Sequence, residues 1–325
     1  MGFDLDLAEV DAAYERLRPI VRCTPVLDWG ETGGWTPAGG LRLTLKLEHL
    51  QLTGSFKVRG AWNLIAGMPP EERARGLVTA SGGNHGLAVA WAAARAGVSA
   101  TVFLPLTTPP AQEAKIRAFG AEVVRAGEAW DDAWVAAAAW ATERDLPLVH
   151  PFDDPRVVAG QATVGVEILE QVPDLDLLLV AVGGGGLIAG VAAYVKQKRP
   201  DLRIVGVEPT GAASMSAALA AGEPVSLPQV RTIAHTLAPR RVSRLTLDLC
   251  RRYVDEIALV EDADLLDAMR VLWADANLLV EPSGAATLAA LYADQVPQAQ
   301  SAHHAVAVVC GANLDAEPAI GRFIG

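Results

Sequence analysis

Two hydrophobic periods alternate along the chain, one typical of strands and one typical of helices. Residues 41–48 (LRLTLKLE) place leucine at every second position, which predicts a strand with one apolar face. Short apolar runs bounded by turn residues predict further strands at 75–81, 99–106, 121–127, 147–152, 175–182, 203–209 and 305–313. Longer segments predict helices at 1–17, 85–97, 109–120, 129–145 and 161–172, and another helix that begins in the glycine-rich stretch 183–190.

Strands that alternate with helices of this length indicate an α/β protein whose sheets are mostly parallel and covered by helices. Residues from about 76 to 150 contain strand, helix, strand, helix and strand in succession, so we expect them to form a small lobe of their own. No Pro/Ser-rich linker or run of charges marks the ends of this lobe, and its boundaries therefore rest on the count of strands.

Composition narrows the range of partners. The 325 residues carry a formal net charge of −11, which argues against a nucleic acid or an anionic membrane as partner. The most apolar stretch, 175–193, contains Asp176 and four consecutive glycines and is a poor membrane span. Cys23, Cys250 and Cys310 are widely spaced, and the N-terminal residues do not resemble an export signal, so we expect reduced thiols and a cytoplasmic location.

Four consecutive glycines, Gly183 to Gly186, follow an apolar strand and open a helix. Glycines at such a junction leave backbone N–H groups free to bind an anion at the helix N-terminus. The alternative is a flexible turn, but four glycines exceed what a turn requires, and each one costs conformational entropy. The acidic partner of the dinucleotide motif and the G-K-[ST] phosphate loop are both absent from the sequence here. We therefore interpret the stretch as a cradle for a phosphate group.

A second polar turn, residues 79–86 (TASGGNHG), also follows a strand and opens a helix. Ser81, Asn84 and His85 lie among three glycines, which gives side-chain donors and exposed N–H groups for a carboxylate or a ring hydroxyl. The alternative is a helix cap, for which Asn84 alone would suffice. His85 on its own also has an ordinary structural interpretation. The whole cluster favours a binding loop.

Lys57 lies where a helix is expected to begin, just after Gly54 and Ser55. Most lysines are on the surface, but a cation in the first turn is disfavoured by the helix dipole, and this position helps to lower the pKa of an amine. A lysine nucleophile needs such a lowered pKa to form a Schiff base. Together with a phosphate cradle and a carboxylate-binding loop, Lys57 indicates pyridoxal 5'-phosphate (PLP) as cofactor and an amino acid as substrate.

Three other residues have an ordinary interpretation beside a functional one. Cys310 ends the last strand and is either a ligand of the cofactor or a small buried apolar residue. Glu281 precedes a helix and is either a cofactor ligand or a helix cap. Glu208 stands at a strand end, where we favour a plain surface charge over a metal ligand.

The motifs GSFKVRGA, SGGNHG, GGGGLIAG, EPSGAA and CGAN occur in an order and at a spacing that resemble the fold-type II PLP enzymes. The likeness is greatest to threonine/serine dehydratases (ammonia-lyases) and serine racemases, and it extends from residue 22 to Asn313. It implies a two-domain fold like that of the tryptophan synthase β-subunit. A large PLP-binding domain would comprise 1–75 and 153–325, and a small mobile domain would comprise 76–152.

The resemblance also implies roles for individual residues. Lys57 would form the Schiff base, Phe56 would flank the cofactor ring, and Asn84 would bond its 3'-oxygen. Cys310 would face the pyridine nitrogen, where the family usually has serine, and Glu281 would belong to the cofactor site. The phosphate would be bound by Gly183, Gly184, Gly185, Gly186 and Leu187. The substrate carboxylate would be bound by Ser81, Gly82, Gly83, Asn84 and His85.

The implied reaction is β-elimination from L-threonine, L-serine or a related β-hydroxy amino acid, β-aryl serines included, to a 2-oxo acid and ammonia. A racemase, a β-replacement enzyme and a PLP-binding protein without turnover are the alternatives. Racemases carry a second serine where this chain has Gly82, which favours the lyase. The family's metal site pairs a residue like Glu208 with an aspartate, and Ser214 stands there instead, so we expect no metal. The segment with His235 and Thr236 also departs from the family pattern.

The family further implies a homo-oligomer, a dimer or a tetramer, with a small amino acid as its only other partner. The chain ends about a dozen residues after Asn313. We therefore expect no C-terminal regulatory domain and no feedback inhibition through one.

Overall fold

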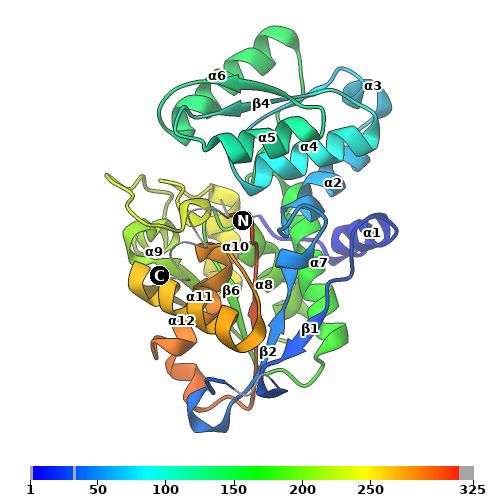
Figure 1. The fold of residues 1–325 in the computed structure, drawn as a ribbon. Helices are drawn as coiled ribbons and strands as arrows, with labels where there is room; N and C mark the ends of the chain where they lie inside the picture. Colours follow the sequence, from blue (N-terminus) through cyan, green and yellow to red (C-terminus); the bar gives the residue numbers. More distant parts are fainter. Residues whose placement is uncertain (1–2, 32–33, 315–325) are drawn as a thin grey trace.

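The structure is a computed structural model that describes residues 3–31 and 34–314. It contains two sheets, and the smaller sheet lies with its helices at the top of Figure 1. The larger sheet has the order β1 (Val26–Asp28), β2 (Arg42–Lys46), β9 (His304–Val308), β6 (Leu177–Ala181), β7 (Arg203–Pro209), β8 (Glu256–Val260). The smaller sheet has the order β3 (Leu77–Ala80), β4 (Ala100–Leu104), β5 (Glu122–Arg125). β1 is antiparallel to β2, and the other pairings of these strands are parallel.

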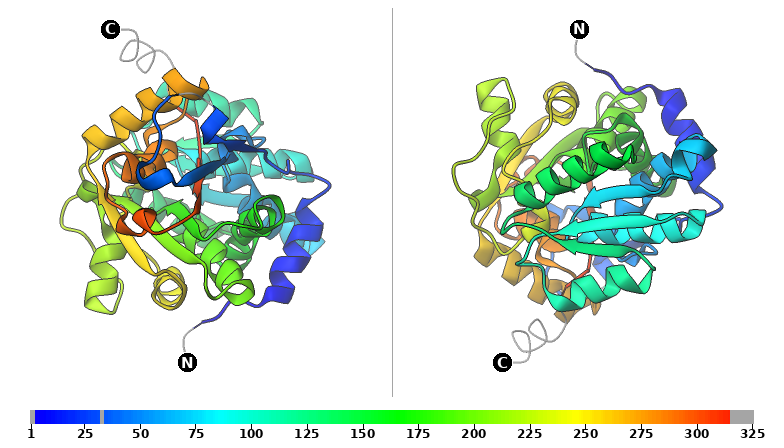
Figure 2. Two further views of the ribbon diagram at one scale, coloured as in Figure 1. Left: turned by 90° about the horizontal axis from the view of Figure 1, so that it is seen from below. Right: turned by 90° about the horizontal axis from the view of Figure 1, so that it is seen from above.

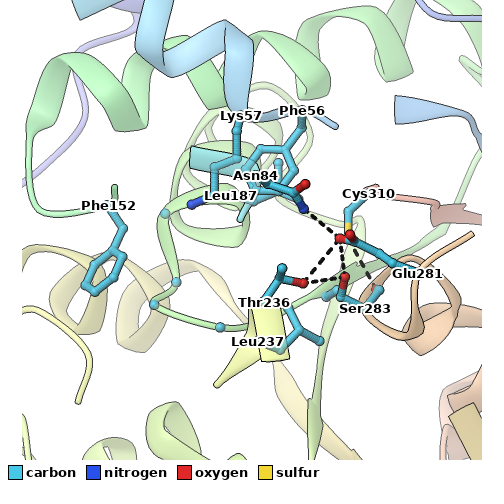
Figure 3. Close-up of a pocket in the computed structure, with 15 residues that line it drawn as sticks. Phe56, Lys57, Asn84, Phe152, Leu187, Thr236, Leu237, Glu281, Ser283 and Cys310 are labelled. Atoms are coloured by element: carbon cyan, nitrogen blue, oxygen red, sulfur yellow. Dashed lines mark hydrogen bonds between the residues drawn. The ribbon is translucent and has the colours of Figure 1, made fainter. Parts of the chain in front are cut away.

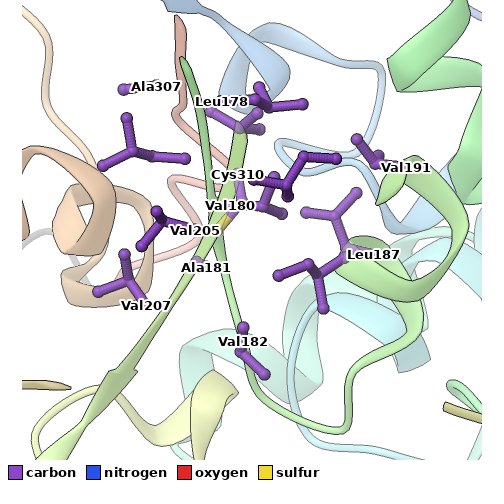
Figure 4. Packing of buried hydrophobic residues seen from close by; sticks show 14 of the residues in the cluster. Leu178, Val180, Ala181, Val182, Leu187, Val191, Val205, Val207, Ala307 and Cys310 are labelled. Carbon is purple, nitrogen blue, oxygen red and sulfur yellow. The ribbon is translucent and has the colours of Figure 1, made fainter. Parts of the chain in front are cut away.

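Helices cover both sheets, and Figure 2 shows them from below and from above. Their bounds are α1 (Leu7–Leu17), α2 (Lys57–Gly67), α3 (Pro70–Arg73), α4 (Asn84–Ala96), α5 (Pro110–Ala118), α6 (Trp130–Arg144), α7 (Pro155–Gln171), α8 (Gly186–Lys198), α9 (Ser214–Ala221), α10 (Arg244–Tyr253), α11 (Asp262–Ala276) and α12 (Pro282–Tyr292). In the main core, Leu187 and Val191 of α8 lie beside the central strand β6 (Figure 4). Over the described ranges, none of these helices is both long and apolar enough to cross a bilayer.

The predicted α/β class with mostly parallel sheets is confirmed, and four local predictions need correction. The helix expected at 1–17 begins at Leu7, because the Asp6 side chain accepts the N–H of Ala8 as an N-cap. The strand expected at 305–313 ends at Val308.

Residues 147–152 do not form a strand, because they make a single bridge from Leu148 to Val78. Pro147 and Pro151 flank the bridge, and proline has no N–H for a strand ladder. The helix expected at 161–172 begins at Pro155, since the Asp154 side chain accepts the N–H of Arg156 as an N-cap.

The smaller sheet, formed by β3, β4 and β5, lies within the residues that we expect to form a second lobe. The domain boundaries 1–75, 76–152 and 153–325, and the mobility of the smaller unit, stay predictions.

A buried cluster of charges joins β2, α2 and α7, and the sequence pattern did not reveal it. Strand 41–48 is buried on both faces from Leu43 onward, so Lys46 is fully buried, although it alternates with the leucines. The Lys46 amine donates to Glu167 Oε2 at 2.6 Å. The Arg59 guanidinium, also fully buried, donates to Glu167 Oε1 and Glu48 Oε1, each at 2.7 Å. Two cations thus balance two carboxylates in the interior.

The pKa values in this cluster follow from the pairing. Burial by itself would raise the pKa of Glu48, but the charge and hydrogen bonds of Arg59 lower it below its ordinary value. Burial would lower the pKa of Arg59, yet Glu48 and Glu167 raise it. Glu48 and Arg59 are therefore charged at neutral pH, and each depends on its partners.

We expect Arg59→Met to lower the free energy of unfolding by about 3–5 kcal/mol, because it leaves two buried carboxylates with one cation. Urea denaturation of the purified protein measures this change. The matched control is Arg270→Met, which removes an exposed pair with Asp267 and should change stability by less than about 0.5 kcal/mol. Equal effects of the two substitutions would contradict the structural role assigned to the cluster.

Candidate active site

A cavity lies at the carboxyl ends of the parallel strands β6 and β9, the usual ligand position in open parallel sheets. Its empty space is about 440 Å³, counting the part that opens to solvent. Its lining comes from segments far apart in the sequence (Figure 3). The lining residues are Phe56, Lys57, Asn84, Phe152, Ala181, Gly183, Gly184, Gly185, Gly186, Leu187, Thr236, Leu237, Glu281, Ser283 and Cys310.

Lys57 is the first residue of α2, and its side chain extends into the cavity. Its amine donates to the Pro151 carbonyl at 3.1 Å and lies 5.2 Å from the centre of the Phe56 ring. Burial lowers the pKa of Lys57 to about 8, while Cys310 and Glu281 oppose the shift. The pKa of Lys57 is lowered, as the sequence predicted, and burial is the main cause. With this pKa, about a tenth of the amine is unprotonated and nucleophilic at pH 7, far more than for an ordinary lysine.

The glycine turn connects β6 to α8, which begins at Gly186. Gly185 has φ +85°, a backbone conformation that favours glycine. A Cβ on Gly184 would lie 2.6 Å from Phe152 Cγ, and a Cβ on Gly185 would lie 2.6 Å from Met215 Cε. The turn thus has no room for side chains. Backbone N–H groups at the start of α8 are left for an anion, which fits a phosphate.

Asn84 and Glu281 form the polar side of the cavity. The Asn84 amide donates to Glu281 Oε1 at 2.6 Å, and its oxygen accepts from Asn313 Nδ2 at 2.7 Å. Glu281 also accepts from Ser283 Oγ at 2.5 Å and Thr236 Oγ1 at 3.2 Å. Neither Asn84 nor Glu281 caps its helix through its side chain, so the capping alternative does not apply to either residue. Burial raises the pKa of Glu281, and its hydrogen bonds oppose that shift.

Cys310 follows β9, and its thiol donates to the Ser283 carbonyl at 3.2 Å. Burial raises the pKa of this thiol well above its ordinary value, with Glu281 adding to the shift. The thiol is therefore neutral at neutral pH. A neutral thiol would not keep the pyridine nitrogen of a bound cofactor protonated, as a carboxylate would.

The predicted substrate loop lies at the start of α4, and of its members only Asn84 belongs to the cavity lining. Ser81 Oγ accepts the N–H of Gly83 at 3.2 Å. His85 is buried, with its Nε2 3.2 Å from the Val149 carbonyl, and burial lowers its pKa. Ser81, Gly82, Gly83 and His85 are neighbours of Asn84 in the sequence but are not among the lining residues. Their binding roles stay predictions.

Five lining residues were not among the predicted site residues. They are Phe152, Ala181, Thr236, Leu237 and Ser283. Ser283 lies within the recognised motif EPSGAA, Ala181 lies just before the glycine motif, and Thr236 lies in the segment that departs from the family pattern. Phe152 had no local signal, because its position depends on the fold of residues 147–152.

The prediction that Glu208 is a surface charge was wrong. Glu208 is fully buried. Its carboxylate accepts the N–H of Met215 at 2.7 Å and the hydroxyl of Ser216 at 2.7 Å, and burial raises its pKa. It therefore anchors the start of α9. Among the described residues, no group of three or more His, Cys, Asp or Glu side chains could hold a metal ion.

The site thus has parts that fit PLP: an amine of lowered pKa, a glycine cradle for phosphate, and a neutral thiol beside the polar group of Glu281 and Ser283. Comparison with known proteins agrees. A family model described as pyridoxal-phosphate dependent enzyme matches residues 17–311. An L-threonine ammonia-lyase of Geobacter sulfurreducens is 40% identical over 306 residues, which is 94% of this chain and 75% of that protein.

Two further relatives differ in the activity that their names give. A phenylserine dehydratase of Ralstonia pickettii is 39% identical, over 96% of this chain and 94% of that protein. The solved structure of maize serine racemase superposes with a TM-score of 0.92 at 32% identity, and it covers 99% of this chain and 97% of that one.

The fold and the site define a PLP-binding enzyme of fold type II. The chain belongs to the family of pyridoxal-phosphate-dependent enzymes, and its cofactor is PLP.

We expect cofactor-stripped protein to recapture PLP at a rate that rises between pH 7 and pH 9 and levels above it. The neutral amine of Lys57 is the reactive form, and its fraction increases through a pKa of about 8. The measurement is the growth of the absorbance band of covalently bound PLP in stopped flow. Lys57→Ala should show no such band at any pH. A rate that is flat across this range would contradict the lowered pKa.

We expect Gly184→Ala to weaken PLP binding by about tenfold or more, because the new methyl group must displace the Phe152 ring and distort the cradle. Equilibrium dialysis with absorbance detection measures the Kd. The matched control is Gly67→Ala at the end of α2, where a Cβ would have Arg16 Cζ as its nearest neighbour, at 3.8 Å. Unchanged PLP affinity in Gly184→Ala would argue against the turn as the phosphate site.

Proposed function

We propose that the chain catalyses PLP-dependent elimination of water from a β-hydroxy amino acid such as L-threonine or L-serine, to give a 2-oxo acid and ammonia. The observation that carries the proposal is the amine of Lys57, whose pKa is lowered to about 8, in a cavity with a glycine cradle and a neutral thiol. The named activity of the ammonia-lyase relative at 40% identity supports it.

Lys57 and Cys310 have different roles in this reaction. PLP supplies an electron-withdrawing ring that makes the Cα proton of the substrate acidic. Lys57 in its neutral form is the base that accepts this proton, since its pKa lies near the operating pH. The neutral thiol of Cys310 leaves the ring a weaker electron sink, which favours elimination over reactions that need a long-lived carbanion.

The reaction releases one water and takes up one water. Cα gives up a proton and Cβ gives up its hydroxyl group, so that one water leaves. The resulting enamine becomes an imine and takes up one water to give the 2-oxo acid and ammonia. The apolar side chains of Phe56, Leu187 and Leu237 line the cavity, and such a lining would limit the contact of a bound substrate with solvent.

For substrate binding, we propose the loop from Ser81 to His85 as the carboxylate site. Its support is the position of the loop at the N-terminus of α4, where backbone N–H groups and the helix dipole favour an anion. Asn84 joins this loop to the cavity, and for Asn84 we propose a bond to the cofactor ring.

Racemisation is the second candidate, because serine racemase is a close structural neighbour. A racemase of this kind needs a second base, and Gly82 offers no side chain. A Cβ at Gly82 would lie 2.9 Å from Thr108 Cγ2, so the buried Thr108 occupies the space that such a side chain would need. This observation favours elimination.

We also propose a homo-oligomer and a cytoplasmic location. The family resemblance supports the oligomer. The sparse cysteines support the location, and each of the three is free in the structure.

We expect purified protein to release a 2-oxo acid and ammonia from at least one member of a panel of L-threonine, L-serine and β-substituted serines. Lys57→Ala should lose this activity by about a thousandfold or more, because the base is gone. Lactate dehydrogenase coupling measures the 2-oxo acid, and chiral chromatography measures the D-isomer. D-serine without pyruvate would support the racemase instead, and the absence of 2-oxo acid from every member would refute the elimination.

A further inference from the structure

Four aromatic rings form a continuous surface beside the cavity, which we name the aromatic wall: Trp130 and Trp134 of α6, and His150 and Phe152. The two indoles are stacked, with centroids 5.6 Å apart and planes at 21°. The Trp134 and His150 rings meet edge to face at 4.5 Å, and the His150 and Phe152 rings do so at 4.7 Å. Trp130, Trp134 and His150 are half-buried, so parts of their faces stay open.

One member of the wall, Phe152, lines the cavity, and the other members lie next to segments of the site. Phe152 lines the cavity and packs against Gly184 of the phosphate cradle. Trp130 Nε1 donates to the Ala80 carbonyl at 2.9 Å, and the next residue is Ser81 of the proposed carboxylate loop. The Lys57 amine donates to the Pro151 carbonyl, between His150 and Phe152. The wall therefore borders the proposed carboxylate loop through Trp130 and the cavity through Phe152.

The wall has no charge, and two of its polar groups are already hydrogen-bonded to the backbone. His150 Nδ1 accepts the N–H groups of Phe152 at 3.2 Å and Asp153 at 2.7 Å. Burial lowers the pKa of His150 to about 4, so its ring is neutral at neutral pH. The Trp130 N–H is already used by Ala80. The wall thus offers π-faces and apolar edges, which suit an apolar or aromatic group.

The opposite side of the cavity is chemically different. There the hydroxyls of Thr236 and Ser283 and the carboxylate of Glu281 hydrogen-bond one another and Asn84. Figure 3 shows this group apart from Phe152, with the Lys57 amine on the side nearer Phe152. A small hydroxylated side chain such as that of serine fills none of the apolar surface that the wall presents.

We propose that the aromatic wall is the subsite for the β-substituent of the substrate, and that it selects β-aryl-β-hydroxy amino acids, such as 3-phenylserine, over threonine and serine. The inference rests on the proposed elimination and names its substrate class. Trp134 is the specificity-determining residue, because its ring contacts both the Trp130 ring and the His150 ring and, unlike those two, makes no hydrogen bond to the described backbone of the site.

The test compares kcat/KM for L-threo-3-phenylserine and L-threonine in the holoenzyme and in Trp134→Leu. The wild type should favour the aryl substrate by about tenfold or more. In Trp134→Leu the ratio of the two values should fall about tenfold, the size of a lost aromatic contact. The matched control is Trp140→Leu on the same helix, where the ring packs on Phe103 and outside the wall, and both values should stay unchanged. A preference for threonine in the wild type, or an equal loss for both substrates in Trp134→Leu, would overturn the subsite.

Binding measured in parallel separates this proposal from the proposed reaction. Titration of the holoenzyme with each amino acid, followed by the cofactor absorbance, gives a Kd that does not depend on turnover. Tighter binding of phenylserine that is lost in Trp134→Leu, without any 2-oxo acid, would support the subsite and refute the elimination. Production of 2-oxo acid from threonine with no aryl preference would support the elimination and overturn the subsite. A lack of response to either amino acid would overturn both.

Discussion

The buried pairing of Arg59 with Glu48 and Glu167 is the constraint on which the position of the active lysine depends. Arg59 is two residues beyond Lys57 on α2. Its guanidinium is satisfied where the turn after β2, which carries Glu48, and the helix α7, which carries Glu167, meet it. An unpaired charge in this interior would cost several kcal/mol, so arrangements that separate these partners are strongly disfavoured. The electrostatics of the interior therefore fix the start of α2, and with it the mouth of the cavity.

Close packing of three helices completes this constraint. A Cβ on Gly160 of α7 would lie 2.7 Å from Gly60 Cα of α2, and a Cβ on Gly190 of α8 would lie 2.9 Å from the Ala162 nitrogen of α7. Glycine at these positions lets α2 and α8 approach α7 from two sides. Because Lys57 begins α2 and Gly186 begins α8, this close approach brings the amine and the phosphate cradle to the same cavity. The catalytic geometry thus follows from helix packing as much as from the residues of the site.

The two sides of the cavity suggest a division of tasks. The polar side, around Asn84 and Glu281, has its hydrogen bonds satisfied within the protein and holds a fixed shape for the cofactor. The aromatic side is half open and uncharged. The polar side can therefore carry the chemistry common to the family, and the aromatic side can carry the choice of substrate. Changes in a few ring contacts on the aromatic side would change selectivity without disturbing the cofactor.

The sequence by itself determined the parallel α/β class, the place of Lys57 at a helix start, and the glycine turn between strand and helix. These features are local, because hydrophobic period, proline, glycine and the helix dipole act over a few residues. It also supported the PLP family through the order of its motifs. Tertiary structure alone decided that Lys46 and Glu208 are buried, that 147–152 is not a strand, and that Asn84 meets Glu281 across 197 residues of chain. Burial and pairing at such separation depend on which surfaces pack together, and no local pattern carries that information.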